Sequence, residues 1–254
     1  MIKIIKKLAP LYVIIFLIIA WEMMTAFFEV PDWLIPRPSA ILLEGIQSFG
    51  DFRHHIFSTI RLTLVGFTIG TSIGIVLSIL LHLLPKIKDM LYPLLILSQN
   101  VPIIVLAPLL VIWFGFGLLP KVIVISLVCF FPVVISALDG FRQTPSEWKH
   151  YVKMMGASRS QLFWKLEMPY ALPAIFSGLK ISATYSVMGA VISEWLGAKS
   201  GIGVYMTLAS SSFRTDRVFV AILTIMIVSL LFFALIVYLE RLFIKGRKKG
   251  ESNR

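Results

Sequence analysis

Apolar residues run along the chain in six long blocks, separated by shorter segments that are rich in polar and charged residues. A helix needs roughly 20 apolar residues to cross the hydrocarbon core of a bilayer, with about 17–25 as the working range. Each block meets this length, so the pattern predicts six transmembrane helices. The blocks are Leu8–Phe28, Leu62–Leu84, Met90–Phe114, Leu119–Leu138, Ala171–Leu196 and Val218–Leu239.

The third block is the least regular, because it carries three prolines and the polar pair Gln99 and Asn100. Breaks in a transmembrane helix are tolerated where a cavity or neighbouring helices satisfy the freed backbone groups. Two interpretations of the pair stay open. It lines a polar path, or it satisfies the carbonyls at the break.

Composition agrees with a membrane protein. Of the 254 residues, 58% are hydrophobic and 15% are charged, whereas soluble domains carry about 45–50% and about 25%. We predict one all-α membrane domain over residues 1–254. The first block resembles a signal peptide, but no clear cleavage site follows it, so we expect a retained span. The single cysteine, Cys129, excludes an intrachain disulfide.

The net charge of +11 is distributed as membrane topology requires. With the N-terminus inside, 16 of the 24 Lys and Arg residues fall on the inner side, and such an excess marks the cytoplasmic face. We therefore expect both termini in the cytoplasm and no nucleic-acid partner. The longest cytoplasmic loop is then residues 140–170.

Local chemistry in this loop predicts two short amphipathic helices. Trp148, Tyr151, Val152 and Met155 recur at helical spacing. Gly156 offers the left-handed conformation that commonly ends a helix.

A second helix start follows the glycine. Ser158 and Gln161 have the spacing of a capping box, and Leu162, Phe163 and Leu166 continue an apolar face toward a possible partner. Pro169 and Pro173 are expected to redirect the chain into the fifth span. A helix pair lying on anionic headgroups and a docking element for a cytoplasmic partner both fit this pattern, and the tight bend favours docking.

The loop also resembles the EAA loop of binding-protein-dependent ABC importer permeases. That motif has a glycine, nine residues, an apolar residue, one more, then Leu-Pro. Here Gly156 is followed by nine residues and then by Leu166, Glu167, Met168 and Pro169, while His150, Tyr151 and Val152 occupy the Glu-Ala-Ala positions.

Further segments in the same order resemble the nitrate, sulfonate, taurine and thiamine-pyrimidine-precursor permeases. They are LIPRPSAI, RLTLVGFTIG, PLLVIWFGFG, FFPVVISALDGFR, SEWLGAKSGIGVYM and FRTDRVFVAI. The resemblance implies that the loop docks on an ATPase subunit. The residues implied in coupling are Glu147, His150, Tyr151, Met155, Gly156, Ala157, Ser158, Leu162, Phe163, Leu166 and Pro169.

Small residues recur every fourth position in two spans. Gly66, Gly70 and Gly74 share one face of the second span, where they let helices approach closely. In the fifth span the stripe is Gly178, Ser182, Ser186, Ala190 and Glu194. We expect Gly178 to pack against a neighbouring helix, while Ser182 and Ser186 are candidates for the solute pathway.

Acids inside a membrane are costly and indicate function. We expect Glu194 to face the pathway or a gate. The alternatives are that it reaches the outer interface or pairs with Arg214 or Arg217. Glu22 is expected to be a second buried acid that is protonated, paired or at a cavity, and it is also a pathway candidate.

Catalytic and metal motifs are missing from the sequence. The four histidines have no metal-site spacing, and no phosphate-binding glycine loop is present. The chain is therefore expected to bind no cofactor or metal, with ATP and Mg held by a partner ATPase, and not to be an enzyme. An intramembrane enzyme, which needs clustered ligands or nucleophiles, is the least favoured class. A self-sufficient carrier or channel is the other alternative.

The resemblance implies a multi-pass permease in the bacterial plasma membrane that works by alternating access. Its implied partners are a cytoplasmic ABC ATPase dimer, an extracytoplasmic solute-binding protein, a second copy of this chain, and membrane lipids. The implied substrate is a thiamine pyrimidine precursor, such as formylaminopyrimidine or hydroxymethylpyrimidine, or else an aliphatic sulfonate, taurine or nitrate.

Overall fold

The computed structural model describes residues 2–244, with side chains from residue 12 onward. Met1 and the basic tail 245–254 lie outside the described residues, and with them part of the charge on which the predicted orientation depends. Every regular element in the described range is a helix. The elements are α1 (Ile2–Phe27), α2 (Pro38–Gln47), α3 (Phe49–Leu83), α4 (Pro85–Gln99), α5 (Ile103–Phe114), α6 (Leu118–Arg142), α7 (Ser146–Met154), α8 (Arg159–Leu162), the π-helical η1 (Phe163–Glu167), α9 (Met168–Glu194), α10 (Ile202–Ser211) and α11 (Thr215–Ile244).

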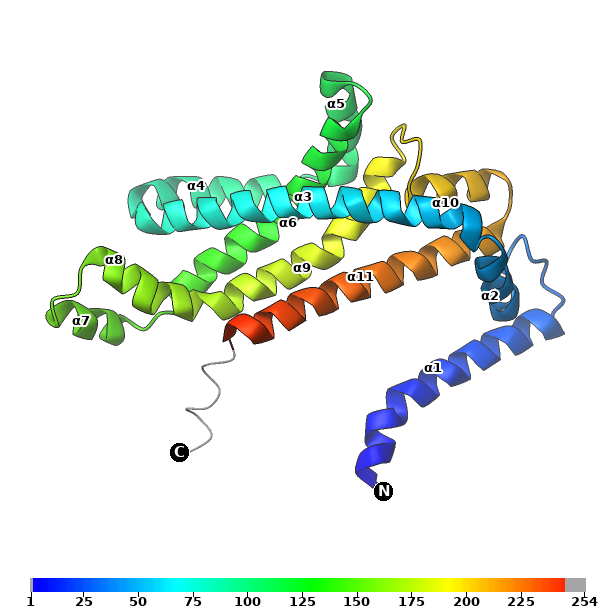
Figure 1. Ribbon diagram of the computed structural model, residues 1–254, viewed down its shortest axis with the longest axis horizontal. Helices are drawn as coiled ribbons and strands as arrows, with labels where there is room; N and C mark the ends of the chain where they lie inside the picture. The colour runs from blue at the N-terminus through cyan, green and yellow to red at the C-terminus, as the bar shows by residue number, and fades with distance from the viewer. Residues whose placement is uncertain (1, 245–254) are drawn as a thin grey trace.

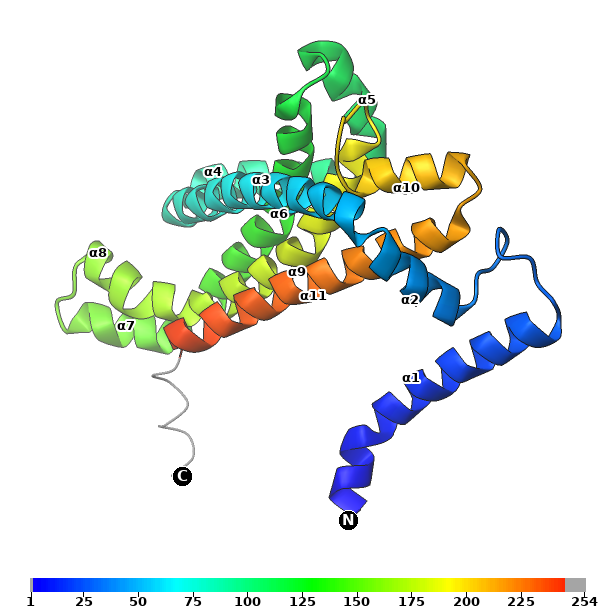
Figure 2. The same ribbon diagram turned by 45° about the vertical axis from the view of Figure 1, so that its right-hand side comes forward.

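Long helices form the body of the molecule. Figure 1 shows α3, α6, α9 and α11 running along its length, with α7 and α8 at one end and α2 and α10 at the other. The turned view in Figure 2 shows α1 standing apart from this bundle, joined to it through α2. The end with α7 and α8 is called the inner end below, and the opposite end the outer end, following the orientation expected from the charges.

Four helices of the described chain are long and apolar enough to cross a membrane: α3, α6, α11 and the continuous stretch Arg159–Glu194. The pair α4 and α5 qualifies as a fifth only if taken together, since the two helices are bent by 95°. The described apolar part of α1, Tyr12–Phe27, is shorter. Two short outer helices, α2 and α10, were not predicted by the hydrophobic pattern.

The irregular third block is thus a bent pair of helices rather than one straight span. The break falls between Gln99 and Ile103, where Pro102 precedes α5 and has no N–H to continue the ladder. Asn100 Nδ2 donates to the Ile96 carbonyl at 2.7 Å, so the side chain satisfies a backbone group at the break. Of the two interpretations of this polar pair, the geometry fits the second at Asn100.

Pro169 and Pro173 do not interrupt the helix where the chain enters the fifth span. A single helical path runs from Arg159 through η1 to Glu194, and both prolines lie within α9. In the π turn the Met168 N–H reaches back five residues to the Phe163 carbonyl. This wider turn accommodates the donor that Pro169 lacks, so the helix is not interrupted there.

Close helix contacts explain the small-residue stripes. A Cβ on Gly66 would lie 2.5 Å from Ile125, and one on Gly70 would lie 2.3 Å from the Ser126 carbonyl oxygen. Gly74 similarly lies against Phe130 on α6, and Gly178 of α9 against Pro132 on α6. Because lipid tails are as apolar as leucine, such tight packing rather than hydrophobic burial holds membrane helices together. Helix α6 is therefore the centre of the bundle, between α3 and α9.

Candidate functional site

The loop after α6 turns tightly at Gly156. The glycine has φ +81°, which strains any residue with a Cβ. Its N–H donates to the Lys153 carbonyl, and the Ala157 N–H donates to the Val152 carbonyl, which is the Schellman arrangement that ends a helix. Ser158 and Gln161 then form a reciprocal capping box that begins the next helix. The sequence thus encodes both sides of the bend.

Large apolar side chains are exposed around this bend. The most exposed are Met154 at 80% and Met155 at 72%, followed by Trp164, Tyr151 and Trp148 at 61%, 54% and 53%. We call these five residues the loop tip. Their clustering on a short polar segment marks an interaction surface.

Two residues expected to face a partner point inward instead. Leu162 is 5% exposed and Phe163 is 4% exposed, and Phe163 packs with Phe141 in the core below the loop. The expected docking face of the second helix was therefore assigned to its wrong side, because a four-residue helix shows too few turns to distinguish the two faces. Gly156, Ser158, His150 and Glu147 are exposed, whereas Ala157, Leu166 and Pro169 are partly buried.

A buried ion cluster lies directly beneath the loop tip. Glu167 is 8% exposed and contacts two ionisable side chains. Its Oε2 lies 2.8 Å from His82 Nε2 on α3, and its Oε1 lies 2.9 Å from Lys149 Nζ on α7. The His82 ring stacks on Phe141 with centroids 4.4 Å apart. One carboxylate thus fastens α7, α3 and the start of α9 to one another.

A second contact joins the same elements. Arg159 Nη2 donates to the carbonyl oxygen of Leu83 at 2.6 Å, so α8 is hydrogen-bonded to the last turn of α3. The Glu167 carboxylate is shielded from water, so removing one of its partners would leave a buried charge without that contact, which is costly. The loop is therefore rigidly connected to the membrane helices at the inner end.

The outer end of α9 carries the other buried carboxylate. Glu194 is 1% exposed. Thr59 on α3 donates its hydroxyl to Oε1 at 2.7 Å, and the Gly203 N–H in the first turn of α10 donates to Oε2 at 2.8 Å. The Thr59 hydroxyl oxygen also accepts from the Ile202 N–H at 2.8 Å. A carboxylate at a helix N-terminus is favoured by the helix dipole.

The turn before α10 is fitted closely to this carboxylate. Gly201 has φ +139°, and a Cβ there would lie 2.1 Å from the Glu194 carboxyl carbon. Its N–H donates to His55 Nδ1 at 3.1 Å. Arg214 and Arg217, the alternative partners suggested for Glu194, instead form ion pairs with Glu44 at 2.9 and 2.7 Å.

Other pathway candidates lie away from open space. Ser182 and Ser186 are fully buried. Ser182 donates to the Cys129 carbonyl of α6, and Ser186 donates to the Ala183 carbonyl of its own helix. Glu22 is half-buried rather than buried, and its carboxylate accepts from the N–H and the hydroxyl of Ser39. Ser182 therefore joins α9 to α6, Glu22 joins α1 to the first turn of α2, and Ser186 bonds within α9.

Sequence reasoning missed His82, Lys149 and Thr59. His82 and Thr59 lie far along the chain from the carboxylates that they contact, and Lys149 lies on a different helix from Glu167. No local pattern therefore joins these three residues to their partners. One signal was available: His82 and Glu167 are ionisable residues at the ends of apolar blocks, where such residues are costly. No group of three or more potential metal ligands occurs among the residues that the structure describes.

The chain is similar to known membrane transport proteins. The family model of binding-protein-dependent transport system inner membrane components matches residues 70–245. The formylaminopyrimidine transport permease ThiX of Halalkalibacterium halodurans is 34% identical over 96% of this chain and 98% of its own length. The taurine transport system permease TauC of Escherichia coli is 32% identical, covering 85% of this chain and 81% of the relative.

A further curated relative and a solved structure extend the comparison. The putative aliphatic sulfonates transport permease SsuC of Bacillus subtilis is 30% identical over 93% of this chain and 86% of its own. The crystal structure of an amino acid ABC transporter with histidines shares the fold, with a TM-score of 0.65 at 16% identity over 78% of this chain and 97% of that chain. This chain is therefore a multi-pass membrane protein of the binding-protein-dependent transport system inner membrane component family, an ABC importer permease subunit of the group that includes ThiX, SsuC and TauC.

Proposed function

We propose that this chain forms one half of a homodimeric pore that imports a small polar solute by alternating access. A separate ATPase dimer, holding ATP and Mg, drives the cycle at the inner end, and an extracytoplasmic binding protein delivers the solute at the outer end. The observation that carries the proposal is the loop tip, an exposed apolar surface mounted on a rigidly anchored helix.

The loop tip has the properties of a docking surface. Its two methionines and three aromatic residues stand on both sides of the Gly156 bend, and methionine adapts to irregular apolar grooves. Lys153 and Arg159 are also exposed beside them. A cytoplasmic protein with an apolar groove and an acidic rim fits this surface. An apolar tip in contact with lipid alone would not require the anchoring ion pairs beneath it.

The contacts beneath the loop tip connect α7 to the membrane helices, so a movement of α7 is passed on to them. Displacement of α7 acts through Lys149 on Glu167, and Glu167 is bonded to His82 on α3 and continues directly into α9. Coupling between distant sites is carried by rigid elements with packed connections. The ATPase therefore moves α3 and α9 together rather than the loop alone.

The membrane arrangement completes the proposal. We assign six spans, with α1 as the first and the bent pair α4 and α5 as the third. Both termini then lie in the cytoplasm. Glu194 acts as an outer gate residue, because it fastens α3 and α9 to the turn before α10. If Glu194→Ala left both solute uptake and ATPase coupling unchanged, the gate role would be rejected.

The substrate comes from the solutes handled by the relatives. We propose two candidate classes of substrate. The first is a thiamine pyrimidine precursor, such as formylaminopyrimidine or hydroxymethylpyrimidine. The second is an aliphatic sulfonate, taurine or nitrate. ThiX, TauC and SsuC support these classes by name. Uptake assays with each solute and the cognate binding protein decide between them.

A glycine pair tests the docking proposal. Gly156→Val strains a residue with φ +81°, while Gly115→Val strains one with φ +74° in the turn before α6; both have open space around the Cβ position. We expect Gly156→Val to abolish co-purification of the ATPase and Gly115→Val to retain it, with both variants inserted in the membrane. Retention by both variants would reject the loop as the docking site.

A further inference from the structure

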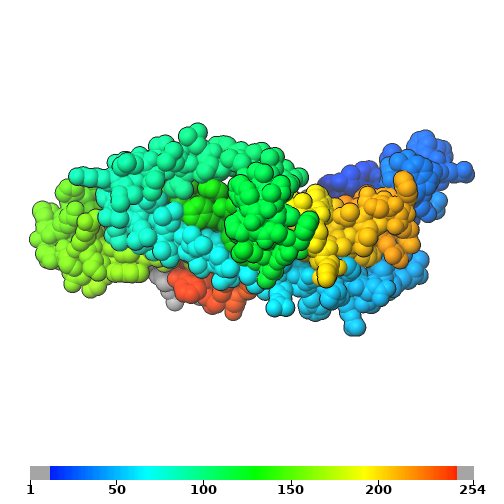
Figure 3. Space-filling model, turned by 90° about the horizontal axis from the view of Figure 1, so that it is seen from above, coloured from blue at the N-terminus to red at the C-terminus, as the bar shows by residue number. Residues whose placement is uncertain are grey.

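A polar cavity opens near the outer end of α3. It has a volume of about 520 Å³ and is walled by α3, the start of α6 and the segment after α9. Figure 3 shows the green region of α5 and the start of α6 beside α3 and the yellow segment at the end of α9. Its position places it at the end of the molecule where a solute is delivered.

Positive charge dominates the cavity wall. Arg61, Lys121 and Lys199 line it, and Glu194 is the one acidic residue in its wall. None of the three basic side chains forms an ion pair with another described residue. Three positive charges against one negative charge leave an excess of two.

The single acid does not neutralise these cations by contact. Both oxygens of Glu194 already accept short hydrogen bonds from Thr59 and from the Gly203 N–H. Lys180 of α9, by contrast, forms an ion pair with Glu240 of α11 at 3.1 Å. Basic residues in membrane segments pair or face a cavity, and Arg61 and Lys121 belong to the second case.

The remaining wall suits an organic anion. Ser58 and Ser200 share a hydrogen bond of 2.9 Å across the cavity wall and offer hydroxyl groups. Phe57, Leu62 and Val65 add apolar surface. A guanidinium group binds a planar or tetrahedral oxyanion through paired N–H groups. Positive clefts of this kind raise the local concentration of anions.

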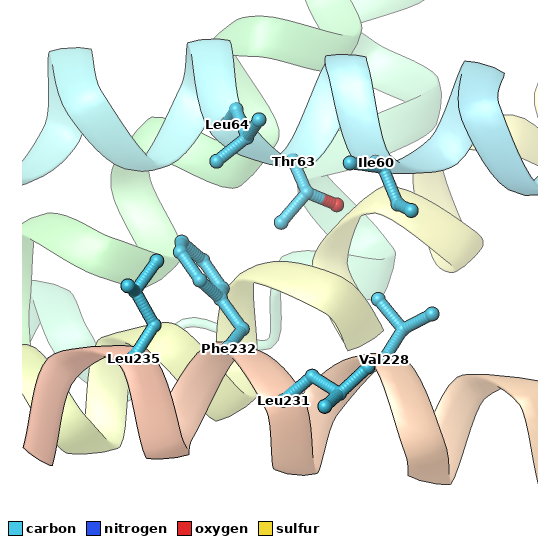
Figure 4. A pocket seen from close by; sticks show the side chains of 7 residues that line it. All are labelled: Ile60, Thr63, Leu64, Val228, Leu231, Phe232 and Leu235. Carbon is cyan, nitrogen blue, oxygen red and sulfur yellow. The ribbon is translucent and has the colours of Figure 1, made fainter. Parts of the chain in front are cut away.

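The second hollow of the molecule shows the contrast. It lies between α3 and α11, has a volume of about 260 Å³, and is lined by hydrocarbon apart from Thr63, as Figure 4 shows. No charged residue lines it. This hollow suits lipid tails or an apolar helix, and the two cavities thus face different chemistry from opposite sides of α3.

We propose that the Arg61–Lys121–Lys199 cavity binds the anionic head group of the transported solute, of sulfonate or carboxylate type, as it enters the permease. That the anion is the transported solute rests on the proposed function, whereas anion binding by the cavity does not. The inference selects the anionic class of candidate substrate over an uncharged pyrimidine.

Charge-selective thiol labelling tests the cavity directly. Ser58→Cys is introduced in the Cys129→Ala background, with Gly50→Cys as control in the first turn of α3, where a Cβ meets nothing within 4 Å. The complex with its ATPase is placed in phosphatidylcholine nanodiscs. Rates are measured with an anionic sulfonatoethyl and a cationic trimethylammonioethyl methanethiosulfonate reagent. We expect the anionic-to-cationic ratio at position 58 to exceed that at position 50 by about tenfold.

Charge removal then identifies the source of the preference. Arg61→Gln combined with Lys121→Gln should bring the ratio at position 58 close to that at position 50, while Arg142→Gln at the inner end leaves it high. A ratio at or below that of position 50, or one unaffected by the double substitution, overturns the proposal.

Ligand protection distinguishes a solute from a lipid. Ethanesulfonate should protect Ser58→Cys from labelling, and the neutral ethanesulfonamide should not. If phosphatidylglycerol protects while ethanesulfonate fails to protect, the cavity holds a lipid headgroup and the proposal is overturned. These readouts do not depend on ATPase docking, so their failure is separate from failure of the Gly156→Val test.

Discussion

Helix α9 carries a buried carboxylate at each end, and the two are held by different kinds of partner. Glu167 at the inner end accepts from the ionisable side chains of His82 and Lys149. Glu194 at the outer end accepts from a hydroxyl and a backbone N–H. Both reach α3, through His82 and Thr59, which are separated by about 35 Å along the helix. The same two helices are therefore fastened at both ends.

Because the partners of Glu167 and Glu194 differ, the two ends of α9 should respond differently to force. The inner carboxylate depends on long side chains from α3 and α7, whose geometry adjusts as those helices shift. The outer carboxylate caps α10 through fixed backbone and a short hydroxyl, so it has little freedom. We infer that the Glu167 contacts at the inner end transmit movement between helices, whereas the Glu194 contacts at the outer end are either fully formed or lost.

The largest effect is expected from Glu194→Ala. It leaves the Gly203 N–H without an acceptor and deprives the buried Thr59 hydroxyl of its 2.7 Å partner, so that only the His55 carbonyl at 3.2 Å remains to it. The expected cost is about 4 kcal/mol in unfolding free energy. Glu22→Ala is the matched control, because Glu22 also accepts from a hydroxyl and a backbone N–H, those of Ser39, but through hydrogen bonds that are open to solvent. Thermal unfolding in mild detergent should show a large drop for Glu194→Ala and a small one for Glu22→Ala. Equal drops would mean that burial does not distinguish the two carboxylates.

Glycine substitutions at the two ends should differ next. Gly201→Ala forces a Cβ against the Glu194 carboxyl group at φ +139°, whereas Gly156→Ala at φ +81° meets nothing within 4 Å. We expect losses of about 3 and about 1 kcal/mol, since the second variant carries only the left-handed backbone penalty. The same unfolding assay measures both. A greater loss at Gly156 would contradict the closer fit of the outer end.

Moderate effects are expected within the Glu167 cluster, and its pairwise coupling should be the smallest quantity measured. Glu167→Ala removes the shared partner of the partly buried His82 and Lys149 side chains and should cost about 2 kcal/mol. A double-mutant cycle of Glu167→Gln with Lys149→Met should give a coupling energy of about 1 kcal/mol. The cycle of Glu194→Gln with Thr59→Val serves as its outer counterpart. A coupling near zero at the inner end would remove Lys149 from the proposed route of movement.

Local patterns in the sequence predicted the features that depend on neighbouring residues. The bend at Gly156 and the capping box of Ser158 and Gln161 are set within a few positions, and both are present. The position of the break near Asn100 follows from Pro102 in the same way. Family membership and the permease group were also predicted correctly, because their motifs extend over the chain.

Features that depend on distant residues could not be predicted. Glu167 meets His82 across 85 positions, and Glu194 meets Thr59 across 135. The orientation of Phe163 depends on Phe141, which packs beneath it only after α6 and α9 assemble. The continuity of the helix through Pro169 depends on a π turn, which no propensity scale identifies. Tertiary packing decides each of these.

The most direct test of the account measures ATP hydrolysis by the reconstituted importer, with and without its binding protein loaded with ethanesulfonate or formylaminopyrimidine in turn. The wild-type complex should respond to one loaded binding protein with faster hydrolysis. Glu167→Ala should retain the bound ATPase and its basal rate but lose that stimulation, because the loop no longer moves α3 and α9. Full stimulation in Glu167→Ala, or solute uptake by this chain without an ATPase, would contradict the account.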